Sequence, residues 1–175
     1  MIANKNTIEE GNNMKKIILL ILVLISGSLS GCLSSDEEEL DEFPSFSLVD
    51  EQGNEHKNSM YGGEPFVAYV SASWCNHCKP ALEALDDTVP EGHILVFNKD
   101  GRERYSDMNE WKDRMESELE RNLSHPFIHA PELSETLNVT GIPAMFFVNS
   151  DGIIEHTLSG VKDQSTIETY WNDLS

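Results

Sequence analysis

The stretch that decides the fold runs from residue 66 to residue 85 and reads F-V-A-Y-V-S-A-S-W-C-N-H-C-K-P-A-L-E-A-L. Its first six residues, Phe66 to Ser71, are rich in β-forming side chains, which predicts a buried strand. Further along, Leu82 and Leu85 share one helical face, and Pro80 is tolerated only in the first turn of a helix. The stretch therefore predicts a strand that leads into a helix, with two cysteines at the junction.

These cysteines, Cys75 and Cys78, form a C-x-x-C pair suited to disulfide exchange. A cysteine attacks a disulfide only as thiolate, and the pKa of a free thiol is roughly 8.5. Cys75 falls at or just before a helix N-terminus, where unpaired N–H groups and the helix dipole lower that pKa. Two intervening residues bring the sulfur atoms within bonding reach, with Cα atoms ~5.5 Å apart. We therefore assign Cys75 as the nucleophile and Cys78, one turn further in and more buried, as the resolving thiol.

Three neighbours of the pair, Trp74, Asn76 and His77, are expected to tune it. Trp74 is expected to pack as an apolar collar. His77 can place a proton or a positive charge near the Cys75 thiolate, which stabilises the reduced form and makes the disulfide more oxidising. The alternative is a solvent-exposed histidine with no effect on the thiolate.

The charge of the chain argues against nucleic acid as a partner. Binding to phosphates needs clustered Lys and Arg, whereas 12 basic and 31 acidic residues give a formal net charge of −19. The length of 175 residues favours one compact domain with extensions at its ends. Three cysteines are too few for a disulfide scaffold, and two of them are the C-x-x-C pair.

The N-terminus has the pattern of an export signal. Lys15 and Lys16 precede an apolar run over residues 17–25, which is shorter than the ~20 apolar residues that a membrane-spanning helix needs. The run exits through L-S-G-C, which resembles the lipobox of exported lipoproteins, and lipid chains on the cysteine anchor a domain stably. We expect a leader over residues 1–31 and lipidation of Cys32, with an uncleaved apolar anchor as the alternative.

Residues 32–42 are expected to form an acidic tether, because their like charges repel one another and extend the chain. Met14 makes a more natural start for the leader than Met1, so we expect translation to begin there. With either type of anchor, we expect residues 43–175 to form a domain at the cell membrane that faces the extracytoplasmic side.

Hydrophobic patterns predict the remaining elements of this domain. Strands are expected at 46–49, 93–97, 144–148 and 153–158, and helices at 107–123, 131–137 and 164–174. This order predicts an α/β fold with a central mixed sheet flanked by helices.

Three pieces of the sequence resemble the thioredoxin superfamily, and within it the TlpA/ResA-like branch of exported redoxins. They are P-S-F-S-L-V-D-E-Q-G at 44–53, A-S-W-C-N-H-C at 72–78 and G-I-P-A-M-F-F-V-N-S-D-G at 141–152. The resemblance implies a thioredoxin fold with an N-terminal strand or hairpin extension and an inserted helix over 107–123. It also implies a thiol–disulfide oxidoreductase that uses no cofactor.

The resemblance also implies roles for residues outside the pair. Pro143 matches a cis-proline site that faces the cysteines, where the backbone of Ile142 would pair with an extended substrate segment; an ordinary trans proline is the alternative. Tyr69 stands where thioredoxin carries a buried acid; Glu83 is a candidate substitute, with an ordinary exposed helix glutamate as the alternative. The implied partners are cysteine-containing protein substrates and a membrane redox partner that recycles the pair. Whether the protein acts as a reductant or as an oxidant or isomerase stays open.

Four other chemistries share parts of the pattern. A structural zinc site needs four ligands, of which the pair supplies two, and His125 and His129 are expected in a loop, so no metal site is predicted. Covalent haem needs C-x-x-C-H, but Lys79 stands at the histidine position. A peroxiredoxin-like peroxidase needs a threonine where Ala72 stands. A copper-delivery module of the related C-x-x-x-C type, with His129 as a distal ligand, is the main non-enzyme alternative.

Overall fold

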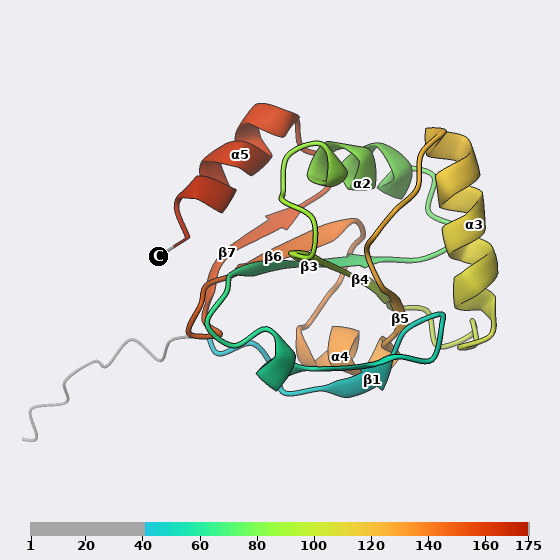
Figure 1. Cartoon of the computed structure of the whole chain (residues 1–175), viewed down its shortest axis with the longest axis horizontal. Coiled ribbons are helices and arrows are strands. Elements are labelled where there is room, and N and C mark those ends of the chain that lie inside the picture. The colour runs from blue at the N-terminus through green and yellow to red at the C-terminus, as the bar shows by residue number, and fades with distance from the viewer. Residues whose placement is uncertain (1–40, 175) are drawn as a thin grey trace, which may run out of the picture. The chain divides into compact units, whose positions relative to one another are not determined.

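The computed structural model of the chain describes residues 41–174, which form a five-stranded mixed sheet with helices on both faces (Figure 1). This architecture confirms the predicted α/β class. The expected leader, the Cys32 lipidation site, the alternative start at Met14 and most of the expected tether lie outside the described residues. None of the helices within residues 41–174 is long and apolar enough to span a membrane.

The elements follow the predicted order with one added strand in the sheet. They are β1 Ser47–Val49, β2 Glu55–Lys57, the 3-10 turn η1 Asn58–Met60, β3 Phe66–Ser71, α2 Cys78–Asp86, β4 Ile94–Asn98, α3 Asp107–Leu119, β5 Phe127–His129, α4 Pro131–Thr136, β6 Ala144–Val148, β7 Ile154–Ser159 and α5 Gln164–Asn172. The sheet has the strand order β5-β4-β3-β6-β7. The β3–β4 and β4–β5 pairs are parallel, and the β3–β6 and β6–β7 pairs are antiparallel. β1 and β2 form the expected hairpin extension.

Strand β3 lies in the middle of the sheet and is buried on both faces. Val67 and Tyr69 belong to the core beneath α2, α3 and α5, whereas Ala68 and Val70 belong to the core on the side of α4 and the β1–β2 hairpin (Figure 1). Successive side chains of a strand point to opposite faces, so one continuous apolar run supplies both cores. The central strand that leads to the cysteines is therefore fixed from both sides.

Two segments differ from the sequence-based expectation. Phe127–His129, expected in a loop, forms β5, because parallel pairing with β4 satisfies the backbone of a run too short to be recognised by its pattern. The helix expected over 107–123 ends at Leu119. Glu120 has a left-handed backbone with φ 54°, and its N–H donates to the carbonyl of Glu116. The chain then turns back, and Leu123 is buried in the core.

The paired backbone of the domain begins within the segment expected as tether. The N–H of Ile154 donates to the carbonyl of Asp41 at 2.8 Å, and Glu42 forms an antiparallel bridge with Ile153. The N–H of Phe43 also donates to the carbonyl of Gly152 at 2.8 Å. The last two residues of the expected tether thus extend the sheet beside the start of β7.

A buried ion pair fastens the β1–β2 hairpin to α3. Lys112 Nζ lies 2.5 Å from Glu51 Oε1, and these side chains are 11% and 2% exposed. Lys112 Nζ also donates to the carbonyl of His125, and the N–H of Phe127 donates to Glu51 Oε2. Each charged group therefore has a hydrogen-bond partner besides the other, which offsets the cost of burying both charges.

We predict that Lys112→Ala lowers the free energy of unfolding by about 3 kcal/mol, because it leaves the Glu51 carboxylate buried without its counterion. Urea unfolding followed by far-UV circular dichroism measures this loss. Lys57→Ala is the matched control, since Lys57 pairs with Glu55 at the surface and such pairs contribute under about 1 kcal/mol. Equal losses of unfolding free energy in the two variants would contradict a stabilising role for the buried Lys112–Glu51 ion pair.

Candidate active site

The two cysteines are joined by a disulfide in the turn that leads into α2. Their Cα atoms are 5.3 Å apart. The N–H of Cys75 donates to the carbonyl of Ala72, and the N–H of Cys78 donates to the carbonyl of Cys75, both at 3.1 Å. Cys78 is the first residue of α2 and is 4% exposed, whereas Cys75 is half-buried in the preceding turn. The residue predicted to attack is therefore the more accessible of the two.

The helix end next to Cys75 favours a negative charge. The first turn of α2 contains no acidic side chain, and its N-cap residue, His77, makes no side-chain capping bond. Pro80, in the same turn, has no N–H to offer. No carboxylate in this first turn therefore weakens the positive end of the helix dipole. A thiolate placed at this end is stabilised.

Tyr69 lies beneath the pair in the main core. Its hydroxyl donates to the carbonyl of Cys78 at 2.6 Å, and the side chain is completely buried. Burial raises the pKa of Tyr69 well above its ordinary value, so the phenol stays protonated and remains a donor. Tyr69 thus fixes the backbone at the start of α2.

The three residues expected to tune the pair are all exposed. Trp74 is 56% exposed, so it stands out from the surface and is not packed around the pair as the sequence suggested. Its indole is oriented by a hydrogen bond, in which Nε1 donates to Asp100 Oδ2 at 2.6 Å. The Arg102 guanidinium beside Asp100 holds the pKa of that carboxyl well below its usual range, so the acceptor stays ionised. The side chains of Asn76 and His77 are open to solvent next to the disulfide.

The Ile142–Pro143 peptide bond is cis, as the family resemblance implied. Pro143 is buried and Ile142 is half-buried. A cavity of about 460 Å³ lies beside Trp74 and is lined by Trp74, residues 99–102 and residues 140–142. The segment before the cis proline and the residue before Cys75 therefore border one depression, as a site for an extended polypeptide requires.

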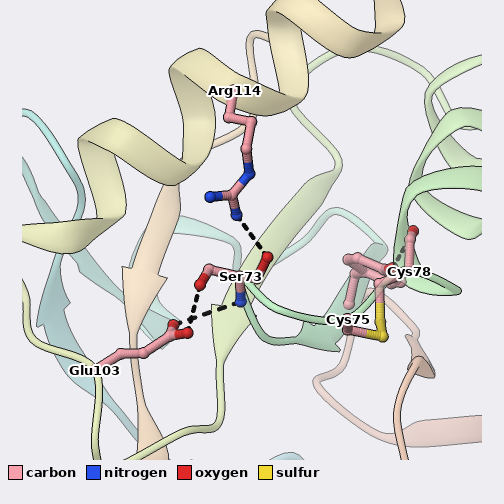
Figure 2. The surroundings of a disulfide bond; sticks show 6 residues. Ser73, Cys75, Cys78, Glu103 and Arg114 are labelled. Atoms are coloured by element: carbon pink, nitrogen blue, oxygen red, sulfur yellow. Dashed lines mark hydrogen bonds between the residues drawn. A yellow bond between two sulfur atoms is a disulfide. The ribbon is translucent and has the colours of Figure 1, made fainter.

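Sequence reasoning missed a group of polar residues that hold the loop before Cys75. Ser73 Oγ donates to Glu103 Oε1 at 2.5 Å, and an Arg114 nitrogen donates to the carbonyl of Ser73 at 2.5 Å (Figure 2). Asn98 donates to the other oxygen of Glu103. Asn98 is the last residue of β4, Glu103 lies in the loop that follows it, and Arg114 lies on α3. The sequence signal for these residues depends on knowing that β3 and β4 are parallel neighbours, because the carboxyl ends of such strands meet at one edge of a sheet.

The two histidines considered as metal ligands have separate partners. His125 is buried, with Nε2 2.8 Å from Asp86 Oδ1, and burial lowers its pKa. His129 Nε2 lies 3.4 Å from the carbonyl of Asp100. Within residues 41–174, no three His, Cys, Asp or Glu side chains are grouped in a way that could hold a metal ion.

Comparisons with known proteins agree with this geometry. A family model described as the AhpC/TSA family matches residues 40–157. The thiol-disulfide oxidoreductase ResA of Geobacillus kaustophilus is 24% identical over 135 residues, which cover 75% of each chain. The thiol:disulfide interchange protein DsbE of Pseudomonas aeruginosa is 24% identical over 163 residues, covering 86% of this chain and 88% of that protein. The pneumococcal exposed lipoprotein thioredoxin Etrx1 of Streptococcus pneumoniae has a TM-score of 0.61 at 23% identity, covering 75% of this chain and 100% of that chain. The expected thioredoxin fold and the resemblance to ResA-like redoxins are thereby confirmed.

We predict that a limiting amount of iodoacetamide alkylates Cys75 before Cys78 in the reduced protein. Cys75 is more exposed than Cys78 and lies where the helix end favours a thiolate. The rate of alkylation rises with both the exposure of a cysteine and its thiolate fraction. Peptide mass spectrometry at increasing pH measures the two sites in one sample, so each serves as the reference for the other. Preferential labelling of Cys78 would reverse the assigned roles.

Proposed function

The chain belongs to the AhpC/TSA family, and on this premise we propose that it is a membrane-tethered, extracytoplasmic thiol–disulfide oxidoreductase that works through Cys75 and Cys78. The observation that carries the proposal is the disulfide between these residues at the start of α2. A pair that bonds at a helix N-terminus can alternate between disulfide and dithiol while the fold around it stays in place. The similar proteins named as thiol-disulfide oxidoreductase and interchange protein support the same activity.

The reaction exchanges one disulfide for another and moves two electrons. In the reducing direction, the Cys75 thiolate attacks one sulfur of a substrate disulfide, forms a mixed disulfide and releases the other substrate sulfur as a thiolate. Cys78 then loses its proton and attacks the sulfur of Cys75. This step releases the second substrate thiolate and closes the Cys75–Cys78 bond. The substrate gains two electrons from the pair, and the oxidising direction is the same sequence reversed.

The surroundings of the pair suit a polypeptide substrate. Trp74, which precedes Cys75 in the chain, and Ile142 border a cavity of about 460 Å³. An extended segment that carries the reacting cysteine can lie against the backbone before Pro143, while its neighbouring side chain enters the cavity. We therefore propose cysteine-containing proteins as substrates, with a membrane redox partner that returns the pair to its working state.

The location rests on the leader and on Cys32. A short apolar run followed by L-S-G-C supports export and lipidation. The structurally similar pneumococcal protein is described as an exposed lipoprotein, which supports the same arrangement. Residues 32–40 would then connect the lipidated cysteine to the domain and keep the disulfide within reach of a membrane partner.

We predict that the full chain reduces insulin in the presence of dithiothreitol and that Cys75→Ser abolishes this activity, because no thiolate remains to attack the substrate. Cys78→Ser keeps the attacking thiol but loses the resolving one, so it should accumulate mixed disulfides that a non-reducing gel separates. Cys32→Ser is the matched control for loss of a cysteine and should keep wild-type turbidity kinetics. Full activity of Cys75→Ser would refute the proposed chemistry.

We predict that the wild-type chain sediments with membranes and incorporates labelled palmitate, whereas Cys32→Ser does not take up the label. Ser30→Ala, two residues earlier, keeps the cysteine and should remain labelled. Palmitate incorporation and fractionation in an exporting bacterial host measure both properties. Unlabelled wild-type protein that stays in the membrane fraction would favour the uncleaved apolar anchor.

A further inference from the structure

Ser73, two residues before the attacking cysteine, is held at three of its atoms by residues far away in the sequence. Its N–H donates to Glu103 Oε2 at 3.4 Å, and its hydroxyl donates to Glu103 Oε1 at 2.5 Å. Its carbonyl accepts a hydrogen bond from Arg114 at 2.5 Å. Figure 2 shows Glu103 and Arg114 reaching Ser73 from different directions, with Arg114 extending from α3. Both backbone polar groups and the side chain of one residue are thus fixed by two charged groups.

The Glu103 carboxylate is itself fixed from behind. Asn98, the last residue of β4, is completely buried and donates its side-chain amide to Glu103. Its amide oxygen also accepts the N–H of Asp100 at 3.0 Å, which shapes the loop that carries Glu103. The hydrogen bonds between Ser73 and Glu103 are therefore connected to the sheet through Asn98 of β4.

Resting on the proposed function, we propose that Glu103 is a positioning residue for the thiol–disulfide exchange. Through Ser73 it keeps the Cys75 sulfur against the N-terminal end of α2 when the pair is reduced. The disulfide holds the two sulfur atoms together only in the oxidised form. Once this bond opens, the turn from Ala72 to Cys75 keeps the hydrogen bond between the Cys75 N–H and the Ala72 carbonyl, and Glu103 with Arg114 supplies a further constraint at Ser73.

The direction in which the pKa of Cys75 changes on replacement of Glu103 distinguishes a positioning role from a simple effect of the Glu103 charge. A carboxylate near a thiol disfavours the thiolate, so removal of a charge alone would lower the pKa of Cys75. Release of the loop moves the sulfur away from the helix end, where the stabilising field falls off within one turn, so loss of positioning raises that pKa. Glu103 as a positioning residue therefore predicts a change opposite to the one that its charge alone would produce.

The test compares Glu103→Ala, Glu103→Gln and Ser73→Ala in the reduced full chain. We expect Glu103→Ala to raise the pKa of Cys75 by about one unit and to slow disulfide reduction about tenfold, as small misplacements of reacting groups do. Glu103→Gln keeps an oxygen that can accept a hydrogen bond from Ser73. Its Cys75 pKa and its rate of disulfide reduction should therefore lie between those of wild type and Glu103→Ala. The pH dependence of Cys75 alkylation gives the pKa, and insulin reduction gives the rate.

A double-mutant cycle tests whether Ser73 transmits the effect. Ser73→Ala should cause a smaller loss than Glu103→Ala, because its N–H can still donate to Glu103. In the Glu103→Ala background, Ser73→Ala should change neither measurement further, since interacting residues are not additive. Glu110→Gln, which removes an exposed carboxylate in the first turn of α3, is the matched control and should behave as wild type.

A lowered or unchanged pKa of Cys75 in both Glu103 variants would overturn the proposal, as would full additivity in the cycle. Urea unfolding of each variant establishes that the measured protein is folded, and Glu103→Gln and Ser73→Ala remain informative if Glu103→Ala is unstable. The alkylation measurement needs no protein substrate. A wild-type chain that fails to reduce insulin would therefore refute the proposed function, while the pKa series still decides the role of Glu103.

Discussion

The parallel pairing of β3 with β4 is the constraint on which the rest of the site depends. It sets Ser71 beside Asn98 at the carboxyl ends of the two strands, and the N–H of Lys99 donates to the carbonyl of Ser71 at 2.9 Å. Neighbouring parallel strands open on the same edge of a sheet, so the loop after β4 must lie against the loop that carries Cys75. Because β3 is buried on both faces, its end has little freedom to move, and the turn that carries the disulfide starts from this fixed end.

The sequence predicts best those elements whose own residues form a recognisable hydrophobic pattern or motif. The run over β3 and the apolar residues of β6 are unbroken, and Cys75 and Cys78 are recognisable from their spacing and from the helix that follows. β5 was missed because its three residues gain their backbone bonds from β4 and not from a local pattern. Glu103 and Arg114 were missed for a related reason: their contacts with Ser73 join segments that are 30 and 41 residues apart, so they appear only once the strand pairing is known.

The extensions added to the basic fold support one another and the site. Helix α3 uses Lys112 to hold Glu51 in the turn of the hairpin extension, and two residues later it uses Arg114 to hold Ser73. Trp111 on the same helix packs edge-on against Phe127, with ring centroids 4.8 Å apart. In a chain with a net charge of −19, these cations do not serve to attract anions from solvent. They are bonded to groups of the fold, and α3 connects the hairpin extension to the loop before Cys75.

The residue buried beneath Cys78 is Tyr69, and its chemistry limits which groups can accept the proton of the Cys78 thiol. The hydroxyl of Tyr69 donates to the carbonyl of Cys78, and burial raises the pKa of this phenol, so Tyr69 cannot accept a proton from the thiol. Glu83, the other candidate for the acid that thioredoxin carries here, lies 3.7 Å from Arg121 and is partly exposed. In the proposed reaction Cys78 must lose its proton before it attacks Cys75, and a phenol that is already protonated cannot take that proton. The buried group that this chain places beneath the pair is therefore bonded to the backbone of Cys78 and supports the start of α2.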